Sequence, residues 1–271
     1  MKFYLCVYSN KKFEIPRKAL VNYSKKSGIF EGIFEYDRDW LVGTEFYKEN
    51  LEILDDPESK GDGWCLWKPY VIMESLKRIE DGDVLIYMDA TDTFFKEDFK
   101  NFLRNSFENS NFLLSRMTTG SPNIKYTKRD TFLHMGCDSI EYWNYPQLEA
   151  GVSGFRKCNE TILFVGEYLK FCSDPRIIKG GKSNDSSDFP EYIEHRYDQS
   201  VLTNLSLKNG IKPNTEIVHF IECNLWESLL YWGNPSDFSR KLSRIRETCG
   251  GEESGDFIKW SSFYLPNLFK S

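Results

Sequence analysis

The sequence predicts an α/β fold: a single domain in which helices flank a mixed, mostly parallel central sheet. Three observations predict it. Residues 2–8 form a continuous run of β-forming residues, which is typical of a buried strand. An apolar period of helical spacing after Pro69 leads directly into a second apolar run at residues 84–88, and a helix followed by a buried strand is the α/β pattern. With 271 residues, the chain is long enough to bury its own core.

Composition excludes several classes of protein. Hydrophobic residues make up 40% and aromatic residues 16% of the chain, which excludes a disordered, collagen-like or coiled-coil protein. The formal net charge of −6 argues against a nucleic-acid partner. The seven cysteines include no CxxC pair, so we expect free thiols rather than a zinc or redox motif. No apolar run suits a secretion signal or a transmembrane segment, and we therefore expect a cytoplasmic protein.

The first half of the chain is expected to alternate strands and helices. A turn at residues 9–12 follows the first strand, and short strands are expected at residues 36–41 and 51–54, before a loop at 57–63. Pro69 suits the first turn of a helix. The apolar face of this helix is formed by Ile72, Met73, Leu76 and Ile79.

Apolar spacing predicts three more helices, near residues 99–107, 162–169 and 198–209. Further strands are expected at residues 111–115 and 216–220. The Gly- and Pro-containing stretch 117–147 and the polar stretch 173–197 are expected to be irregular.

Acidic residues directly follow the buried strand at 84–88. Asp89 and Asp92 are separated by Ala90 and Thr91, and ligands in open α/β sheets lie outside the carboxyl ends of the strands. Carboxylates at such a place suit Mg²⁺ or Mn²⁺. The alternative is that the two aspartates form a turn and a helix N-cap, for which aspartate is also common.

Several residues around this strand resemble a known family. The order of Trp67-Lys68-Pro69-Tyr70, a helix, Gly82-Asp83 and the strand ending in Asp89-Ala90 resembles the nucleotide-sugar-binding half of a GT-A glycosyltransferase, whose fold is Rossmann-like. The metal motif of that family is Asp-X-Asp, whereas here Thr91 holds the third position and the next acid is Asp92. The resemblance implies that Asp89 lies near the ribose and the metal, that Asp92 binds the metal, and that Lys68 and Ala90 contact the donor.

Two later segments extend the likeness to glycogenin-like transferases. Residues 148–155 resemble their Asn-Ala-Gly stretch, which implies that the sugar approaches the backbone at Gly151. Residues 195–202 resemble their Asp-Gln motif, which implies that Asp198 and Gln199 lie beside the anomeric carbon and that His195 contacts the donor. The alternative readings are a bulge glycine at 151, a helix N-cap at Asp198 and a surface histidine at 195.

The resemblance also implies the remaining site residues and the division of the chain. His219 would be a further metal ligand, Tyr8 and Ser9 would lie beside the base, and Asp198 or Glu149 would be the base of an inverting reaction. The single domain, residues 1–271, would consist of a nucleotide-sugar-binding half at 1–115, an acceptor and catalytic half at 116–233, and a docking segment at 234–271.

These expectations define a function. The chain would move a hexose from a nucleoside diphosphate sugar, most simply a UDP-sugar, to a glycan acceptor with help from Mn²⁺ or Mg²⁺. The Asp-Gln likeness favours retention of the anomeric configuration. One alternative is a non-catalytic carbohydrate- or nucleotide-binding protein on the same scaffold. A second is a phosphohydrolase of the haloacid-dehalogenase type, whose Asp-X-Asp-X-Thr signature residues 89–93 approach.

Overall fold

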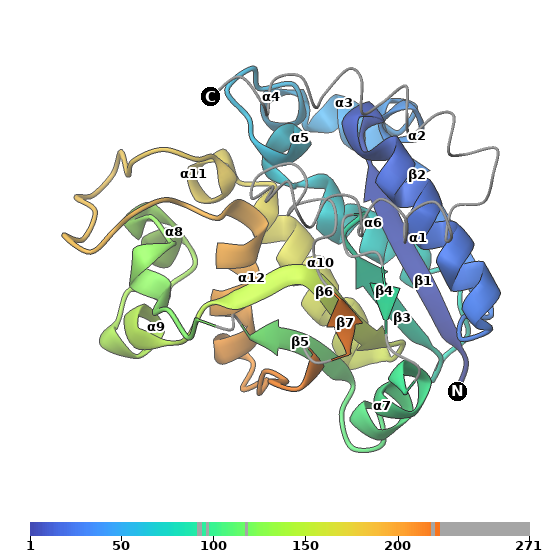
Figure 1. Ribbon diagram of the computed structural model, residues 1–271. Helices are drawn as coiled ribbons and strands as arrows, with labels where there is room; N and C mark the ends of the chain where they lie inside the picture. Colours follow the sequence, from blue (N-terminus) through green and yellow to red (C-terminus); the bar gives the residue numbers. More distant parts are fainter. Residues whose placement is uncertain (91–93, 96–97, 117–118, 218–219, 223–271) are drawn as a thin grey trace, which may run out of the picture.

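The computed structural model describes residues 1–90, 94–95, 98–116, 119–217 and 220–222. Figure 1 shows strands of one central sheet between two layers of helices. The strands are β1 (Phe3–Ser9), β2 (Gly32–Asp37), β3 (Val84–Met88), β4 (Phe94–Phe95), β5 (Phe112–Arg116), β6 (Leu148–Arg156) and β7 (Ile221–Glu222). The α-helices are α1 (Glu14–Ser27), α2 (Arg38–Val42), α3 (Glu45–Glu49), α4 (Leu51–Leu54), α5 (Gly61–Trp64), α6 (Trp67–Leu76), α7 (Phe99–Ser106), α8 (Arg129–His134), α9 (Ile140–Asn144), α10 (Asn159–Cys172), α11 (Pro175–Ile178) and α12 (Tyr197–Lys208). Two short 3₁₀ turns are η1 (Lys11–Phe13) and η2 (Asn123–Lys125).

The central sheet has five strands in the order β2-β1-β3-β6-β5. β1 pairs in parallel with β2 and with β3, whereas β6 is antiparallel to both β3 and β5. Within this sheet β6 therefore runs against the other strands, which share one direction. The predicted α/β fold with a mixed, mostly parallel sheet is confirmed. A separate antiparallel pair joins β4 to β7.

Alternation along β1 divides the core into two halves, one on each face of the sheet. Leu5 and Val7 pack in the half that α1 and α7 cover, and Cys6 and Tyr8 pack in the half that α6, α10 and α12 cover. Figure 1 shows α1 in front of the sheet and α6 and α10 behind it. Because both faces are covered, all five residues of β3 are buried, as expected of a central strand with helices on both sides.

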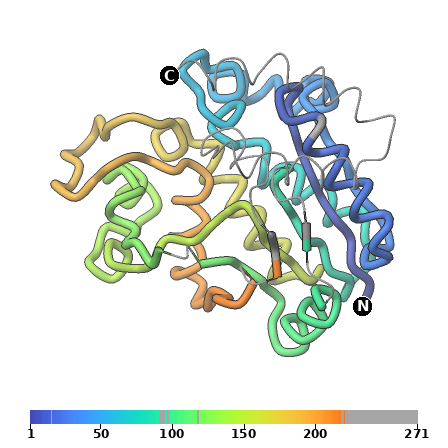
Figure 2. The backbone as a smooth tube through the Cα atoms, viewed as in Figure 1, coloured from blue at the N-terminus to red at the C-terminus, as the bar shows by residue number. Residues whose placement is uncertain are grey.

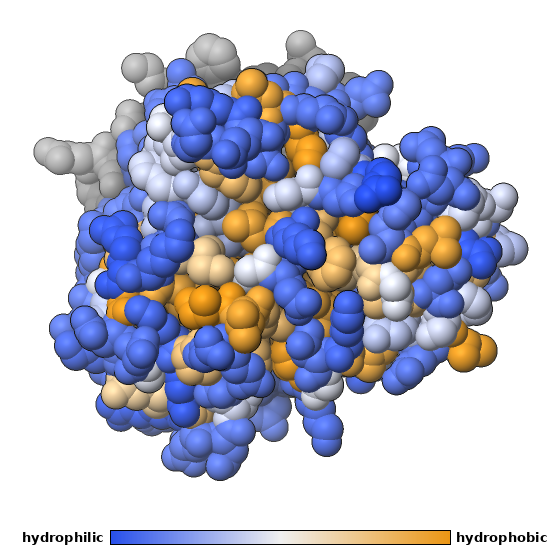
Figure 3. Space-filling model, turned by 180° about the vertical axis from the view of Figure 1, so that it is seen from behind, coloured by the Kyte–Doolittle hydropathy of each residue, from blue (hydrophilic) through white to orange (hydrophobic). Residues whose placement is uncertain are grey.

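The face behind the sheet is seen in Figure 3, where polar residues cover most of the surface and apolar ones show between them. Single exposed apolar side chains such as Leu163 of α10, 62% exposed, are ordinary for a folded protein. Within the described residues, no helix combines the length and the hydropathy that crossing a bilayer requires. The five cysteines that the structure describes are free thiols, as predicted for them.

Most predicted elements with a strong apolar period are confirmed. They correspond to β1, β3, β5, α6, α7, α10 and α12. The predicted strand at 51–54 is wrong, because these residues form α4, which buries Ile53 and Leu54. The predicted strand at 36–41 combines the end of β2 with the start of α2, where the Asp37 side chain caps the helix by accepting from the Trp40 N–H. Of the predicted strand at 216–220, residues 218–219 lie outside the described part, and the observed strand begins at Ile221.

Other elements were not predicted at all. The helix α1 follows the expected turn at 9–12 and buries Leu20 and Val21, although five of its fourteen residues are charged. The stretch 117–147, expected to be irregular, contains α8 and α9. The predicted irregular stretch 173–197 contains the short helix α11. The residues between α11 and α12 form a long loop, as predicted, and Figure 2 shows it running outward and returning to α12. Asp130 of α8 holds this loop by accepting from the backbone N–H groups of Asn184 and Asp185.

Candidate functional site

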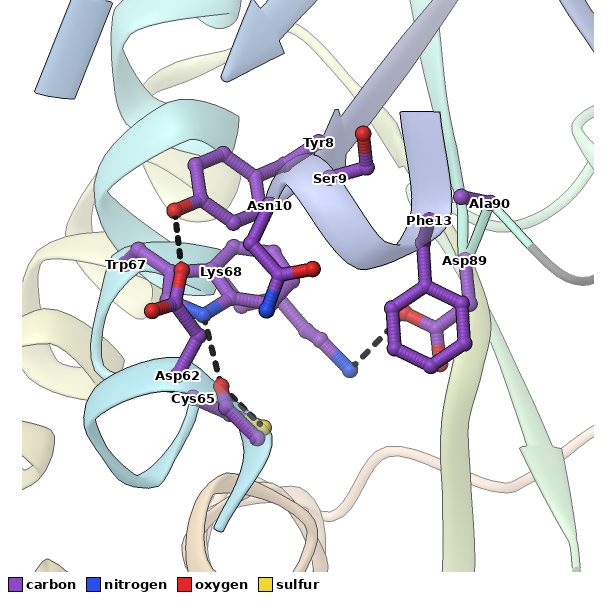
Figure 4. Close-up of a pocket in the computed structure, with 11 residues that line it drawn as sticks. Tyr8, Ser9, Asn10, Phe13, Asp62, Cys65, Trp67, Lys68, Asp89 and Ala90 are labelled. Atoms are coloured by element: carbon purple, nitrogen blue, oxygen red, sulfur yellow. Dashed lines mark hydrogen bonds and ion pairs between the residues drawn. The ribbon is translucent and has the colours of Figure 1, made fainter. Parts of the chain in front are cut away.

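A pocket of about 270 Å³ opens at the carboxyl ends of β1 and β3 (Figure 4). This is the place where open α/β sheets bind ligands. It brings together five of the residues predicted to bind a donor: Tyr8, Ser9, Lys68, Asp89 and Ala90. The other lining residues are Asn10, Phe13, Gly61, Asp62, Cys65 and Trp67.

Lys68 is the centre of a charged cluster at one side of the pocket. Its Nζ lies 3.2 Å from Oδ1 of Asp89 and 3.2 Å from Oδ2 of Asp198. The same ammonium donates to the carbonyl oxygen of Ala150 at 3.0 Å. Lys68 is 4% exposed and Asp198 3% exposed, whereas 37% of the Asp89 side chain is exposed. Two carboxylates against one ammonium leave this cluster with a net negative charge.

Two tyrosines complete the cluster, one for each carboxylate. The Tyr87 hydroxyl donates to Oδ1 of Asp89, and the Tyr168 hydroxyl donates to Oδ2 of Asp198 at 3.1 Å. Burial raises the pKa of the Asp198 carboxyl, although the Lys68 ammonium opposes this shift. Burial lowers the pKa of Lys68, but the carboxylates of Asp198 and Asp89 outweigh it, and the net shift is upward. Lys68 therefore stays charged, and it is the group that makes an ionised Asp198 tolerable in the interior.

The sequence places Lys68 in the cluster through the first turn of α6. Pro69 follows it at the helix start, where a missing N–H has no consequence. The neighbouring Trp67 is 7% exposed, and the Lys68 ammonium lies 5.1 Å from the ring centroid of Tyr87. The aliphatic stem of the lysine is thus buried among aromatic side chains, and its ammonium is held at the pocket.

The segment before α6 has an unusual backbone. Residues 61–65, which include α5, all have positive φ: 65° at Gly61, 60° at Asp62, 83° at Gly63, 55° at Trp64 and 61° at Cys65. They form one left-handed turn, a conformation that costs a residue other than glycine about 1–2 kcal/mol. Glycine is required at 63 because a Cβ there would lie 2.7 Å from the Cα of Leu54.

The left-handed turn places Asp62 at the pocket. Its Oδ2 accepts from the Tyr8 hydroxyl and its Oδ1 accepts from Nη1 of Arg38 at 3.2 Å. The ring of Tyr8 stacks on Trp67 with centroids 4.0 Å apart. Burial, followed by the charge of Asp62, raises the pKa of the Tyr8 hydroxyl, so Tyr8 remains a hydrogen-bond donor over the physiological range.

A second pocket, of about 240 Å³, adjoins the first and shares Ser9 and Asn10 with it. It lies at the carboxyl ends of β1 and β2 and is rich in charged residues. They are Lys11, Glu14, Arg17, Asp37, Arg38 and Asp39. Ser9 lines both pockets, and its hydroxyl is buried without a hydrogen-bond partner among the described residues.

Three other predicted residues lie on or next to β6. The carbonyl oxygen of Gly151 accepts from the Asp89 N–H at 2.7 Å, and Oε1 of Gln199 accepts from the Ala150 N–H at 3.5 Å. These contacts fasten the predicted Gly151 and Gln199 segments to the Lys68 cluster. Glu149 lies in β6 in register with Ser115 and is not among the residues that line either pocket.

His195, predicted to contact a donor, is buried away from the lining residues. Its Nδ1 accepts from the Lys128 N–H at 3.4 Å, and its Nε2 donates to the carbonyl oxygen of Ile177 at 2.9 Å. Burial, helped by the charge of Lys128, lowers the pKa of His195 to about 3. The neutral ring thus fastens the loop before α12 to α8 and α11. In this arrangement neither ring nitrogen is available to bind a donor sugar nucleotide.

Two of the three predicted metal ligands, Asp92 and His219, lie outside the described residues. Asp89 uses Oδ1 for Lys68 and Tyr87, which leaves Oδ2 available at the pocket. In the part of the chain that the structure describes, no three His, Cys, Asp or Glu side chains come together in a way that could hold a metal ion. A single carboxylate oxygen beside a net negative cluster suits one ligand position of a divalent cation.

Sequence reasoning missed Asp62, Trp67, Cys65 and Arg38 as pocket residues. The signal for Asp62 was present, because a Gly-Asp-Gly sequence at 61–63 favours backbone conformations with positive φ. No local sequence pattern indicates Arg38 as a pocket residue, because only the tertiary fold brings it to the pocket wall.

Comparison with known proteins gives structural likeness alone. No protein-family model matches the sequence, and no curated protein is similar to it. Mouse xyloside xylosyltransferase 1 is similar at a TM-score of 0.43 and 11% identity, over 79% of this chain and 85% of that one. The bifunctional glycosyltransferase WbbM gives 0.42 and 11%, over 75% of this chain and 37% of that one. The 4-diphosphocytidyl-2C-methyl-D-erythritol synthase of Anaerococcus prevotii gives 0.37 and 10%, over 77% and 98%.

Proposed function

We propose that this protein is a glycosyltransferase that moves a hexose from a nucleoside diphosphate sugar, with uridine as the nucleoside, to a saccharide acceptor. The observation that carries the proposal is the Lys68 cluster, in which one buried ammonium joins Asp89 and Asp198 at the carboxyl end of β3. A site for glycosyl transfer needs charged groups that are fixed before the reaction, because the transition state separates charge. The cluster meets this requirement.

The size of the site supports a nucleotide-sized ligand. The two adjoining pockets measure about 270 and 240 Å³, so only together do they reach the roughly 300–1,000 Å³ that is typical of small-molecule sites. In the proposed pose the base and ribose lie along the end of β1, near Tyr8 and Ser9. The pyrophosphate lies beside Asp89, and the hexose extends toward β6.

The charge of the site supports a divalent cation. The cluster of Lys68, Asp89 and Asp198 has a net negative charge and would repel a pyrophosphate that came without a counter-ion. Mn²⁺ or Mg²⁺ would be held by Asp89, together with Asp92 and His219 from outside the described residues. When bound, such an ion neutralises the negative charge that grows on the departing diphosphate.

The protein side chains have separate roles in this reaction. The bond between the anomeric carbon and the phosphate oxygen breaks, and the acceptor oxygen forms a new bond on the same face. Asp198 is already bound by Lys68 and Tyr168, so it is not placed to take the acceptor proton. We therefore assign that proton to the departing phosphate oxygen, which gives retention, and we assign Asp198 to holding Lys68, with Gln199 anchoring β6 beside the hexose.

The test is release of nucleotide from UDP-glucose, UDP-galactose or GDP-mannose with Mn²⁺, with and without a chelator. We expect metal-dependent release from a UDP-sugar, and we expect Asp89→Asn to reduce it by about 100-fold. Asp81→Asn is the matched control, since the Asp81 side chain is 88% exposed and lines neither pocket.

Three outcomes would contradict the proposal. Binding of the nucleotide sugar without turnover, even with acceptors present, would favour a binding protein. Release of phosphate from sugar phosphates would favour a phosphohydrolase. Equal activity of the Asp89→Asn and Asp81→Asn variants would show that the chemistry does not take place at the end of β3.

A further inference from the structure

The Asp62 carboxylate is a pocket-lining charge to which the proposed reaction gives no role. Figure 4 shows it directed at the Tyr8 hydroxyl. We propose that Asp62 is a ligand-binding residue that accepts hydrogen bonds from a vicinal pair of hydroxyls, those of the ribose of the bound nucleotide. This inference rests on the proposed function, because it assumes that a nucleoside diphosphate occupies the pocket.

The first argument is the backbone that carries Asp62. Asp62, Trp64 and Cys65 all adopt positive φ, a conformation that is strained for residues other than glycine. Strain of this kind persists where the surrounding structure fixes it, and it clusters at ligand sites. Here the surroundings do fix it, since Nε1 of the buried Trp64 donates to Asp56 at 3.0 Å.

The second argument is the way in which the carboxylate is held. Tyr8 donates to one oxygen and Arg38 to the other, so the group is oriented before any ligand arrives. An ionised carboxylate offers about four acceptor positions, which leaves capacity for two ligand hydroxyls. Two neighbouring hydroxyls of a ribose match the two oxygens of one carboxylate in spacing.

The third argument is position. Asp62 joins the first pocket, which it lines, to the second, which Arg38 lines. A base at the end of β1 and a pyrophosphate at Asp89 would place the ribose in the first pocket, which Tyr8, Asp62 and Asp89 line together. Ser9 lines both pockets. The rings of Tyr8 and Trp67, which stack on each other, form part of the wall of the first pocket.

The direction in which the affinity for the diphosphate changes when the charge of Asp62 is removed distinguishes hydrogen bonding to the ligand from a purely electrostatic effect. If Asp62 only contributes negative charge, then removing that charge strengthens the binding of an anionic diphosphate. If it accepts hydrogen bonds from the ligand, then removing the charge weakens binding in spite of the lower repulsion. The two readings predict opposite changes in affinity.

The experiment is calorimetric titration of the full chain with UDP, 2′-deoxy-UDP and UDP-glucose in the presence of Mn²⁺. Asp62→Asn is the test variant, because asparagine also tolerates positive φ. Asp55→Asn is the matched control: Asp55 also pairs with Arg38 and accepts from Tyr47, but it lines neither pocket. We expect Asp62→Asn to weaken UDP binding by about tenfold and Asp55→Asn to leave it within about twofold.

The deoxy ligand makes the assignment specific. Wild type should bind 2′-deoxy-UDP about tenfold more weakly than UDP, whereas Asp62→Asn should bind the two about equally, because the lost interaction is the same one. Unchanged or tighter UDP binding by Asp62→Asn overturns the inference and leaves the proposed function standing. A loss seen with UDP-glucose but not with UDP overturns the ribose assignment in favour of the hexose. Failure of wild type to bind any of the three ligands overturns the proposed function, and the inference with it.

Discussion

At the scale of single residues, Lys68 is the side chain on which the site depends most. It is the cation between two carboxylates, one buried and one at the pocket surface. A buried ion pair contributes little net stability compared with apolar residues of the same shape, yet removing one partner is strongly destabilising because it leaves a charge uncompensated. Lys68 thus links the stability of the fold to the electrostatics of the pocket.

A Lys68→Met variant tests this link. We expect it to lose about 3–5 kcal/mol of unfolding free energy at neutral pH, measured by urea denaturation. Burial already raises the pKa of Asp198, and loss of the ammonium raises it further. An acid whose pKa is raised in the folded state loses stability as the pH rises from its unfolded-state pKa, about 3.9 for aspartate, to its folded-state pKa. The deficit should therefore be largest at pH 7–8 and shrink toward pH 4.

The control is Lys77→Met, whose partner Glu74 lies on the surface of the molecule. An exposed pair of this kind contributes about 0–1 kcal/mol. Equal losses in the two variants, or a Lys68→Met deficit that does not depend on pH, would show that the cluster is not a coupled buried ion pair.

The residues of this cluster were within reach of sequence reasoning because each follows or opens an element with a strong apolar pattern. Lys68 lies in the first turn of α6, Asp89 directly follows β3 and Asp198 lies in the first turn of α12, so the topology of an α/β sheet brings them together. Arg38 and Asp62 could not be predicted in this way, since tertiary contacts alone bring them to the pocket. His195 shows the opposite limit: the family resemblance implies a contact with the donor sugar nucleotide, but in the structure the buried ring bonds to the backbone of Lys128 and Ile177 instead.

At the scale of elements, the left-handed turn at 61–65 and the strand β6 depend on glycines that a periodicity argument overlooks. β6 was not predicted as a strand because glycine weakens a β pattern. In the structure a Cβ at Gly154 would lie 2.8 Å from the ring of Phe107 and 2.9 Å from Ile86. This glycine is therefore required for packing in the core, rather than for approach of a sugar.

Two glycines with the same backbone conformation separate strain from crowding. Gly63 and Gly82 have φ of 83° and 84°, but a Cβ meets nothing within 4 Å at Gly82, whereas at Gly63 it meets the backbone of Leu54. We expect Gly82→Ala to lower the unfolding free energy by about 1–2 kcal/mol. Gly63→Ala should lower it by about 1–3 kcal/mol more, because backbone atoms must move. Equal losses of unfolding free energy for the two variants, measured by urea denaturation, would mean that the pocket wall at residues 61–65 moves readily to accommodate the added Cβ.

At the scale of the whole molecule, the sheet joins the two halves that the sequence resemblance separates. Apart from its last residue, β5 lies in the first half, residues 1–115. Its partner β6 lies in the second half and also pairs with β3 of the first half. The fold class followed from sequence because apolar runs identify buried strands. The order β3-β6-β5 could not be predicted from sequence. β6 comes later in the chain than β3 and β5, yet it lies between them in the sheet.

This strand order predicts that the two halves unfold together. Cys6 in β1 and Cys172 in α10 are both free and fully buried, and they report on opposite halves of the chain. Brief alkylation across a urea series, read for each cysteine by mass spectrometry, should give the same midpoint for both thiols, because removal of β6 would leave the apolar β3 without a partner on one side. Cys158, half-buried at the start of α10, should react at lower urea than either and serves as the reference for accessibility. Separate midpoints for Cys6 and Cys172 would mean that the halves are independent folding units and that the continuous sheet does not bind them into one cooperative domain.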